Sequence, residues 1–204
     1  MRTEGAYALR SLSLVASGLP ICVIDIEMTA PYRDNAPTPL VWSLAAVRME
    51  GQRAVTRMSR LVRIGQLLSQ SVATLCGVAP DVAQRSGVTL RDALRDLSVV
   101  GESAIWVGHG IDFHDAPILR KAYAAEHIAL PPSLASGAER KIDTFRLARE
   151  LFPTPGKGDH SLSLGALGES LGVPHDPGAL HSALADADLC ALVLYALLDM
   201  ARGA

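Results

Sequence analysis

A chain of 204 residues, 49% of them hydrophobic, has the length and apolar content of one globular domain. Its formal net charge of -2, without a run of Lys and Arg, argues against a broad surface for long duplex nucleic acid, although a pocket could hold a few nucleotides at a strand end. Cys22, Cys76 and Cys190 lie far apart without CxxC spacing, which argues against a zinc site or disulfide framework and favours a reducing, cytoplasmic compartment.

The first half of the chain predicts mainly strands. Residues 21–26, ICVIDI, form an apolar run typical of a central strand. Residues 40–50 and 53–64 predict two further strands, joined by a hairpin turn at Gly51. The apolar stretch before residue 21 is broken by Ser, Gly and Pro, so neither a membrane span nor a cleaved signal peptide is expected.

The second half alternates helices with short strands. Residues 69–97 read as helical pieces, with Thr89 as the N-cap of the last one. Short strands are expected over residues 103–109 and 141–145. Helices are expected over residues 115–127, with Asp115 at the cap, and over residues 146–152, 161–172 and 181–200.

This order of elements predicts an α/β domain with a mixed sheet flanked by helices. Residues 1–18 are expected to form an N-terminal extension with a short helix, and residues 19–204 a single domain. Residues 19–204 contain no linker long enough to mark a second domain.

Two carboxylates, Asp25 and Glu27, interrupt the end of the first apolar run. Side chains alternate along a strand, so both lie on one face, with Cα atoms about 6–7 Å apart. Two charges at that separation repel by about 2.5 kcal/mol at an effective dielectric constant of about 20, and burial adds several kcal/mol per ion. A bound Mg²⁺ or Mn²⁺ would offset both costs. A strand end that reaches solvent, with both carboxylates hydrated, is the alternative.

A further carboxylate lies in the most apolar predicted helix, residues 181–200. This helix is apolar on nearly all sides and should be largely buried. Asp186 shares a side with Cys190, so its charge needs a partner, whereas Asp188 points elsewhere as a solvated or capping residue. His181, at the start of the helix, could lie over the same site.

These residues resemble motifs of the DEDDh, or DnaQ-like, 3′–5′ exonucleases. D-I-E-M-T (residues 25–29) and H-S-A-L-A-D-A (residues 181–187) resemble the first and third motifs. IDTFRLARELFP (residues 142–153) and HSLSLGALGESLGV (residues 160–173) resemble the segments that precede the third motif. The resemblance runs in order over about residues 19–198 and implies a ribonuclease H-like fold with about five strands.

The second motif departs from the usual H-N-x-x-F-D of the family. Aligned from His109 without a gap, His114 falls on the Asp position; one extra residue places Asp115 there, and Asp112 is the third option. We favour Asp115, because some family members show G-H-N-I-x-x-F-D before a basic amphipathic helix. Gly110 replaces an Asn that we expect to shape the loop rather than perform chemistry.

The resemblance implies a chemical role for each motif. Asp25, Glu27, Asp115 and Asp186 would hold two Mg²⁺ or Mn²⁺ ions, and His181 would act as general base, a task that suits an imidazole. The substrate-binding residues would be Met28 and Thr29, in the first motif, and His109, in the second. The implied reaction is hydrolysis at the 3′ end of single-stranded DNA or RNA to nucleoside 5′-monophosphates, in proofreading or DNA repair beside a polymerase or another replication or repair protein.

Two other functions fit the same residues. The E-M-T variant also resembles oligoribonuclease, an RNA-trimming exoribonuclease. The irregular second motif favours a catalytically inactive nucleic-acid-binding module of the same fold. Buried carboxylates without a metal ion are costly to keep, which argues against the inactive module.

Overall fold

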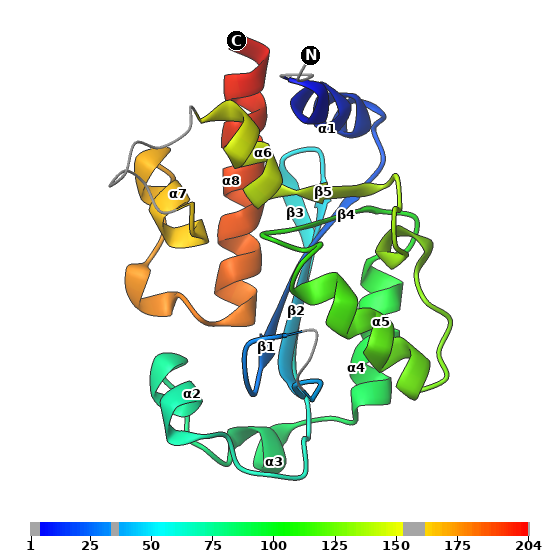
Figure 1. The fold of residues 1–204 in the computed structure, drawn as a ribbon, viewed down its shortest axis with the longest axis vertical. Helices are drawn as coiled ribbons and strands as arrows, with labels where there is room; N and C mark the ends of the chain where they lie inside the picture. The colour runs from blue at the N-terminus through cyan, green and yellow to red at the C-terminus, as the bar shows by residue number, and fades with distance from the viewer. Residues whose placement is uncertain (1–4, 34–36, 153–161, 204) are drawn as a thin grey trace.

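One mixed sheet organises the molecule. The computed structural model describes residues 5–33, 37–152 and 162–203. Its strands, in the order β3-β2-β1-β4-β5, are β1 (Ile21–Met28), β2 (Val41–Glu50), β3 (Arg53–Leu61), β4 (Ile105–Gly108) and β5 (Lys141–Asp143) (Figure 1). β1 is central, antiparallel to β2 and parallel to β4. The predicted five-stranded mixed sheet is confirmed.

The predicted hairpin joins β2 to β3. Gly51 has a φ of 58°, a left-handed conformation that glycine adopts without a steric penalty. The strand predicted over residues 53–64 ends at Leu61 as β3, and Val62 then bridges to Val88. The hairpin extends the sheet on one side of β1, because β2 pairs with both β1 and β3. β2 is buried along most of its length.

Helices cover both faces of the sheet. The described residues form α1 (Ala6–Ala16), α2 (Gln70–Leu75), α3 (Val82–Ser86), α4 (Leu90–Val100), α5 (Asp115–Ala125), α6 (Thr144–Leu151), α7 (Leu164–Ser170) and α8 (Ala183–Gly203). Two short 3₁₀ turns, Pro132–Leu134 and Pro177–Ala179, accompany them. Two predictions fall partly outside the described ranges. They concern residues 1–4 of the predicted extension and residue 161, the first residue of the helix predicted over residues 161–172, which the structure shows as α7.

Of the three apolar clusters in the described residues, the two largest hold these layers together. One lies between the sheet and α1, α6, α7 and α8, and the other between the sheet and α4 and α5 (Figure 1). Tyr7 and Ala8 of α1 belong to the first core, so the N-terminal helix packs onto the same sheet as the rest of the chain. Although α8 is mostly apolar, no helix in the described part of the chain has the length and hydropathy needed to cross a membrane.

Helix caps match the sequence with one exception. The Thr89 hydroxyl accepts the N–H of Asp92 at 3.1 Å and caps α4, as predicted. The prediction that Asp115 caps α5 is wrong by one residue, because His114 occupies the cap and Asp115 is the first helical residue. A tight turn causes the difference: the His114 N–H donates to the Gly110 carbonyl at 3.0 Å.

Candidate metal centre

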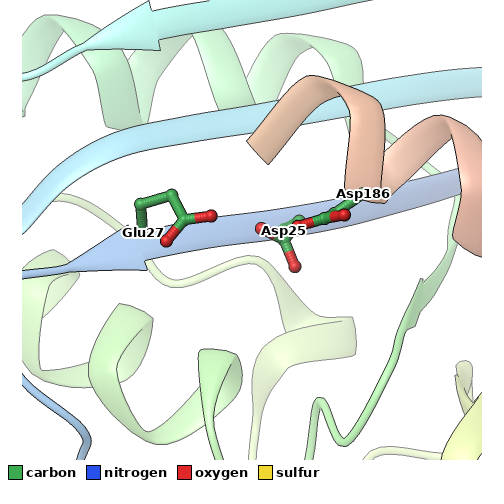
Figure 2. A group of neighbouring side chains, drawn as sticks. All are labelled: Asp25, Glu27 and Asp186. Atoms are coloured by element: carbon green, nitrogen blue, oxygen red, sulfur yellow. The ribbon is translucent and has the colours of Figure 1, made fainter. Parts of the chain in front are cut away.

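The central strand places Asp25 and Glu27 on the face covered by α8. Side chains at alternate positions of β1 face the same way, and Val23, two residues before Asp25, lies in the core beneath α8. On β2 the partners of Asp25 and Glu27 are Ala45 and Ser43, two small residues that leave space above the strand. Both carboxylates are therefore half-buried at the carboxyl end of β1 (Figure 2).

Asp186 approaches this pair from the first turn of α8. Asp25, Glu27 and Asp186 each offer one carboxylate oxygen, and these oxygens lie within 4.8 Å of one another (Figure 2). The Asp186 carboxylate also accepts the backbone N–H of His181 at 3.0 Å. Asp188, in contrast, forms an ion pair with Arg57 at 2.9 Å. The apolar helix thus brings one of its two nearby acids to the strand.

Asp115 reaches β1 from its other edge. β4 pairs with Ile21 to Val23, and within the described residues no strand pairs with the following part of β1 on that side. The Asp115 carboxylate fills this position and accepts the N–H of Ile26 at 3.2 Å. Asp115 is only 4% exposed.

The other two candidates of the second motif have different surroundings. Asp112 forms an ion pair with Lys141 at 2.5 Å, and His114 is exposed at the start of α5. Of the three residues that the sequence left open, Asp115 is the one that hydrogen-bonds to β1.

The crowded carboxylates give the site a strongly negative electrostatic potential. Burial, followed by the charges of Asp115, Asp186 and Glu27, raises the pKa of Asp25 well above its usual range. Burial and the charges of Asp186 and Asp115 raise the pKa of Glu27 to about 7. Burial also raises the pKa of Asp115 to about 7, although backbone N–H groups oppose the shift. A nearby cation would therefore stabilise the ionised form of each of these carboxylates.

The donor set fits a hard divalent ion. All the converging ligand atoms are carboxylate oxygens, the ligands that Mg²⁺ and Mn²⁺ prefer. Burial, followed by the neighbouring carboxylates, raises the pKa of Asp25, and a divalent ion would offset both effects. Asp25, Glu27 and Asp186 form the group itself, with Asp115 adjoining it across β1.

His181 stands at the rim of this centre. It is exposed and, together with Asp25 and Asp186, lines a cavity of about 390 Å³. Its φ of 65° is uncommon for a residue other than glycine, and the hydrogen bond from its N–H to Asp186 holds this conformation. Burial raises the pKa of Asp186, while this N–H and the nearby His181 side chain oppose the shift.

His109 lines the same cavity but has both ring nitrogens engaged inside the protein. Nε2 lies 2.9 Å from the Leu162 carbonyl oxygen, which only accepts, so Nε2 carries the hydrogen. Nδ1 therefore accepts the Thr144 hydroxyl at 3.0 Å. Burial lowers the pKa of His109 to about 4, which keeps the ring neutral. His109 thus ties the end of β4 to the segment before α7.

A buried aspartate fixes the turn that carries the second motif. Asp143 accepts the N–H of Gly110 and the N–H of Phe145, each at 2.9 Å. Gly110 has a φ of 72°, and a Cβ there would lie 3.0 Å from the His114 ring. Asn also tolerates this left-handed conformation, which agrees with the expected loop-shaping role of position 110.

Met28 and Thr29 lie beside the centre rather than in its cavity. Met28 packs against the core beneath α4 and α5. The Thr29 hydroxyl accepts the N–H of Leu40 at 3.1 Å, and Thr29 lines a separate hollow of about 560 Å³ together with Arg33.

The sequence reasoning missed three residues near the site: Thr144, Asp143 and Cys76, whose Sγ lies 3.9 Å from a Glu27 carboxylate oxygen. Of these three residues, only Asp143 and Thr144 gave a signal, because the D-T pair lies in a segment that resembles the family; the sequence assigned neither residue a role.

The chain matches one protein family and one characterised relative over most of its length. The RNase_T family model, described as "Exonuclease", matches residues 22–194. The DNA polymerase III subunit epsilon of Aquifex aeolicus (strain VF5) is 29% identical over 181 residues, which span 87% of this chain and 79% of the epsilon subunit.

Several solved structures share the fold. E. coli exonuclease I in complex with a dT13 oligonucleotide has a TM-score of 0.72 at 15% identity, over 91% of this chain and 42% of that one. A zinc-bound E. coli exonuclease I–single-stranded DNA complex has a TM-score of 0.68 at 15% identity, over 90% and 40%. Exonuclease I from Methylocaldum szegediense has a TM-score of 0.69 at 17% identity, over 88% and 40%. The chain therefore spans less than half the length of these structures.

Proposed function

Because the chain belongs to the RNase_T exonuclease family and has its DnaQ-like, ribonuclease H-like fold, we propose that it hydrolyses phosphodiester bonds one at a time from the 3′ end of a single strand. The products would be nucleoside 5′-monophosphates. The observation that carries this proposal is the convergence of the Asp25, Glu27 and Asp186 carboxylates, with Asp115 against the same strand.

The four carboxylates are proposed to hold two divalent ions, Mg²⁺ or Mn²⁺. Bound ions would polarise the scissile phosphate and stabilise charge on the attacking and leaving oxygens. The all-oxygen donor set supports Mg²⁺ or Mn²⁺, and the zinc-bound form of a similar exonuclease I supports a divalent ion in this fold. Asp115 would also keep the edge of β1 in place through its hydrogen bond to Ile26.

His181 is proposed to accept the proton of the attacking water. Its exposure at the rim of the cavity allows water to reach the ring, and its backbone is fixed by Asp186. Metal binding and proton transfer are thereby linked, because the Asp186 carboxylate both orients His181 and faces the proposed metal ions.

The cavity wall would receive the terminal nucleotide. Leu164, Gly165 and Ala166 of α7 line the same cavity as Asp25 and Asp186. His109 would hold this wall through Leu162. Met28 and Thr29 would contact the nucleic-acid strand just outside the cavity. They lie at the carboxyl end of β1, on the side away from the cavity.

Single-stranded DNA is the proposed substrate and a polymerase the proposed partner. Structurally similar exonuclease I chains bind dT13 and dA16 oligonucleotides, and the Aquifex aeolicus relative is a polymerase III subunit. Proofreading or DNA repair would be the corresponding role. The three free cysteines support a reducing, cytoplasmic location for this work.

End-labelled strands test the direction and the product. With Mn²⁺, a 3′-labelled single strand should lose its label at once as a mononucleotide, whereas a 5′-labelled strand should shorten by single nucleotides. Asp25→Asn should abolish both results, and Asp188→Asn, at an exposed ion pair, should preserve them. Early loss of the 5′ label would reverse the proposed direction. DNA and RNA versions of the strand compare the two substrate classes.

A further inference from the structure

A second polar pocket lies on the edge of the sheet, outside the metal centre. Its volume is about 510 Å³, within the range of small-molecule sites. Helix α1 contributes Tyr7 and Arg10, and β5 contributes Lys141. None of its lining residues lines the cavity that contains Asp25 and Asp186. The α1 side of the pocket also precedes residue 22, where the match to the exonuclease family begins.

Positive charge gathers in this pocket although the protein as a whole is slightly acidic. Four cationic side chains line it, Arg10, Arg120, Lys141 and Arg146, against the acids Asp112 and Glu139. Lys141 is only 6% exposed and pairs with Asp112 at 2.5 Å. One acid is therefore already committed to the buried lysine.

The three arginines have only neutral partners. Arg10 donates to the carbonyl oxygens of Lys141, at 3.2 Å, and of Glu139. Arg120 donates to the Leu134 carbonyl at 3.1 Å. The guanidinium carbon of Arg146 lies 4.2 Å from the centre of the Tyr7 ring. Within residues 5–33, 37–152 and 162–203, none of the three forms an ion pair.

Their carbonyl and ring contacts hold these groups in place without neutralising them. Like charges around one cavity repel, and an anion that enters it removes this repulsion. Guanidinium groups match phosphate geometry with pairs of N–H donors. We propose that this pocket binds the phosphate monoester of a nucleotide, either as a free mononucleotide or as the 5′-phosphorylated end of a strand.

The charge and size of the pocket favour a phosphate monoester over a carboxylate or a bare ion. Asp112 is paired with Lys141, so Glu139 is the one remaining acid of the pocket and leaves about two of the three guanidinium charges unbalanced. A carboxylate ligand neutralises one charge, whereas a phosphate monoester carries nearly two near neutral pH. A volume of about 510 Å³ leaves room for a sugar and base beside the phosphate. The inference does not depend on the proposed exonuclease reaction.

Calorimetric titration without divalent ions, in EDTA, tests this pocket separately from the metal centre. The probes are 2′-deoxyadenosine 5′-monophosphate, deoxyadenosine, and one tetranucleotide with and without a 5′ phosphate. The proteins are the parent, Arg146→Gln, Arg120→Gln and the control Arg95→Gln, whose side chain is exposed on α4. Arg10 is left intact because it holds the 139–141 backbone, and circular dichroism checks that each variant folds.

The monophosphate should bind the parent and Arg95→Gln equally, and Arg146→Gln and Arg120→Gln about tenfold or more weakly, because each loses a charge-assisted contact. Deoxyadenosine should not bind. Arginine-dependent binding of the phosphorylated tetranucleotide would identify a strand end as a source, and binding of the mononucleotide alone a free nucleotide. Equal affinity in all four proteins, equal binding of the nucleoside, or no binding of either phosphate-bearing ligand would overturn the proposal.

Discussion

Replacing Asp115 by Asn should change the stability of the metal-free protein in a way that depends on pH. The carboxyl of Asp115 is 4% exposed, faces other carboxyl groups and accepts the N–H of Ile26. Asn has nearly the same shape and keeps an oxygen for this hydrogen bond, but it cannot ionise. The substitution therefore removes a buried negative charge while it leaves the local geometry in place.

The magnitude follows from the pKa of Asp115, which burial raises from 3.8 to about 7. Because the folded state binds the proton more tightly than the unfolded state, the stability that Asp115 contributes is present below about pH 4 and is lost as the pH rises through about 7. The full loss is on the order of 4 kcal/mol, at 1.36 kcal/mol for each tenfold change in proton affinity. The stability of Asp115→Asn minus that of the parent should therefore increase by up to about 4 kcal/mol between pH 4 and pH 8.

Urea unfolding of both proteins in EDTA, at pH 4, 6 and 8, measures this difference. The new amide group can cost about 1–3 kcal/mol if an N–H stays unpaired, but that cost is the same at each pH and cancels. Asp188→Asn, at an exposed ion pair, is the matched control and should show little change. A difference that stays constant from pH 4 to pH 8 would refute the idea that Asp115 is a desolvated member of the acidic cluster.

Three further predictions concern the metal, the base and the cavity wall. Mn²⁺ affinity should rise as the pH increases past about 7, where Glu27 loses its proton, and calorimetry should detect proton release; equal affinity at pH 6 and pH 8 would contradict this. His181→Ala should lower turnover about 10²–10⁴-fold while Mn²⁺ affinity in a metal titration stays near that of the parent. Thr144→Val should cost about 1–3 kcal/mol of unfolding free energy, because His109 Nδ1 loses its donor, whereas Thr144→Ser should not.

Local pattern was sufficient to predict most of the fold. The apolar run before Asp25 predicted a central strand, and Gly51 marked the hairpin between β2 and β3 correctly. The position of α1 was not predictable in this way, because its contacts depend on distant partners. Tyr7 reaches Asp143, whose N–H donates to the Tyr7 hydroxyl at 2.7 Å across more than a hundred residues.

The candidate site shows the same division between local and distant information. Alternation along β1 predicted that Asp25 and Glu27 share a face, and the spacing along α8 predicted that Asp186, rather than Asp188, turns inward. Periodicity could not choose between Asp112 and Asp115, which lie in one short turn. Their surroundings differ through a long-range ion pair, since Lys141 of β5 holds Asp112 and the open edge of β1 receives Asp115.

Hydrolysis of a linear single strand and of a covalently closed circle of the same sequence tests the central claim most directly. Both substrates contain the same phosphodiester bonds, but only the linear strand has a 3′ end. With Mn²⁺, the linear strand should be converted to nucleoside 5′-monophosphates while the circle stays intact, and Asp25→Asn should act on neither. Comparable rates on the two substrates would mean that the carboxylates of β1 and α8 support cutting inside a strand, and would contradict the exonuclease account.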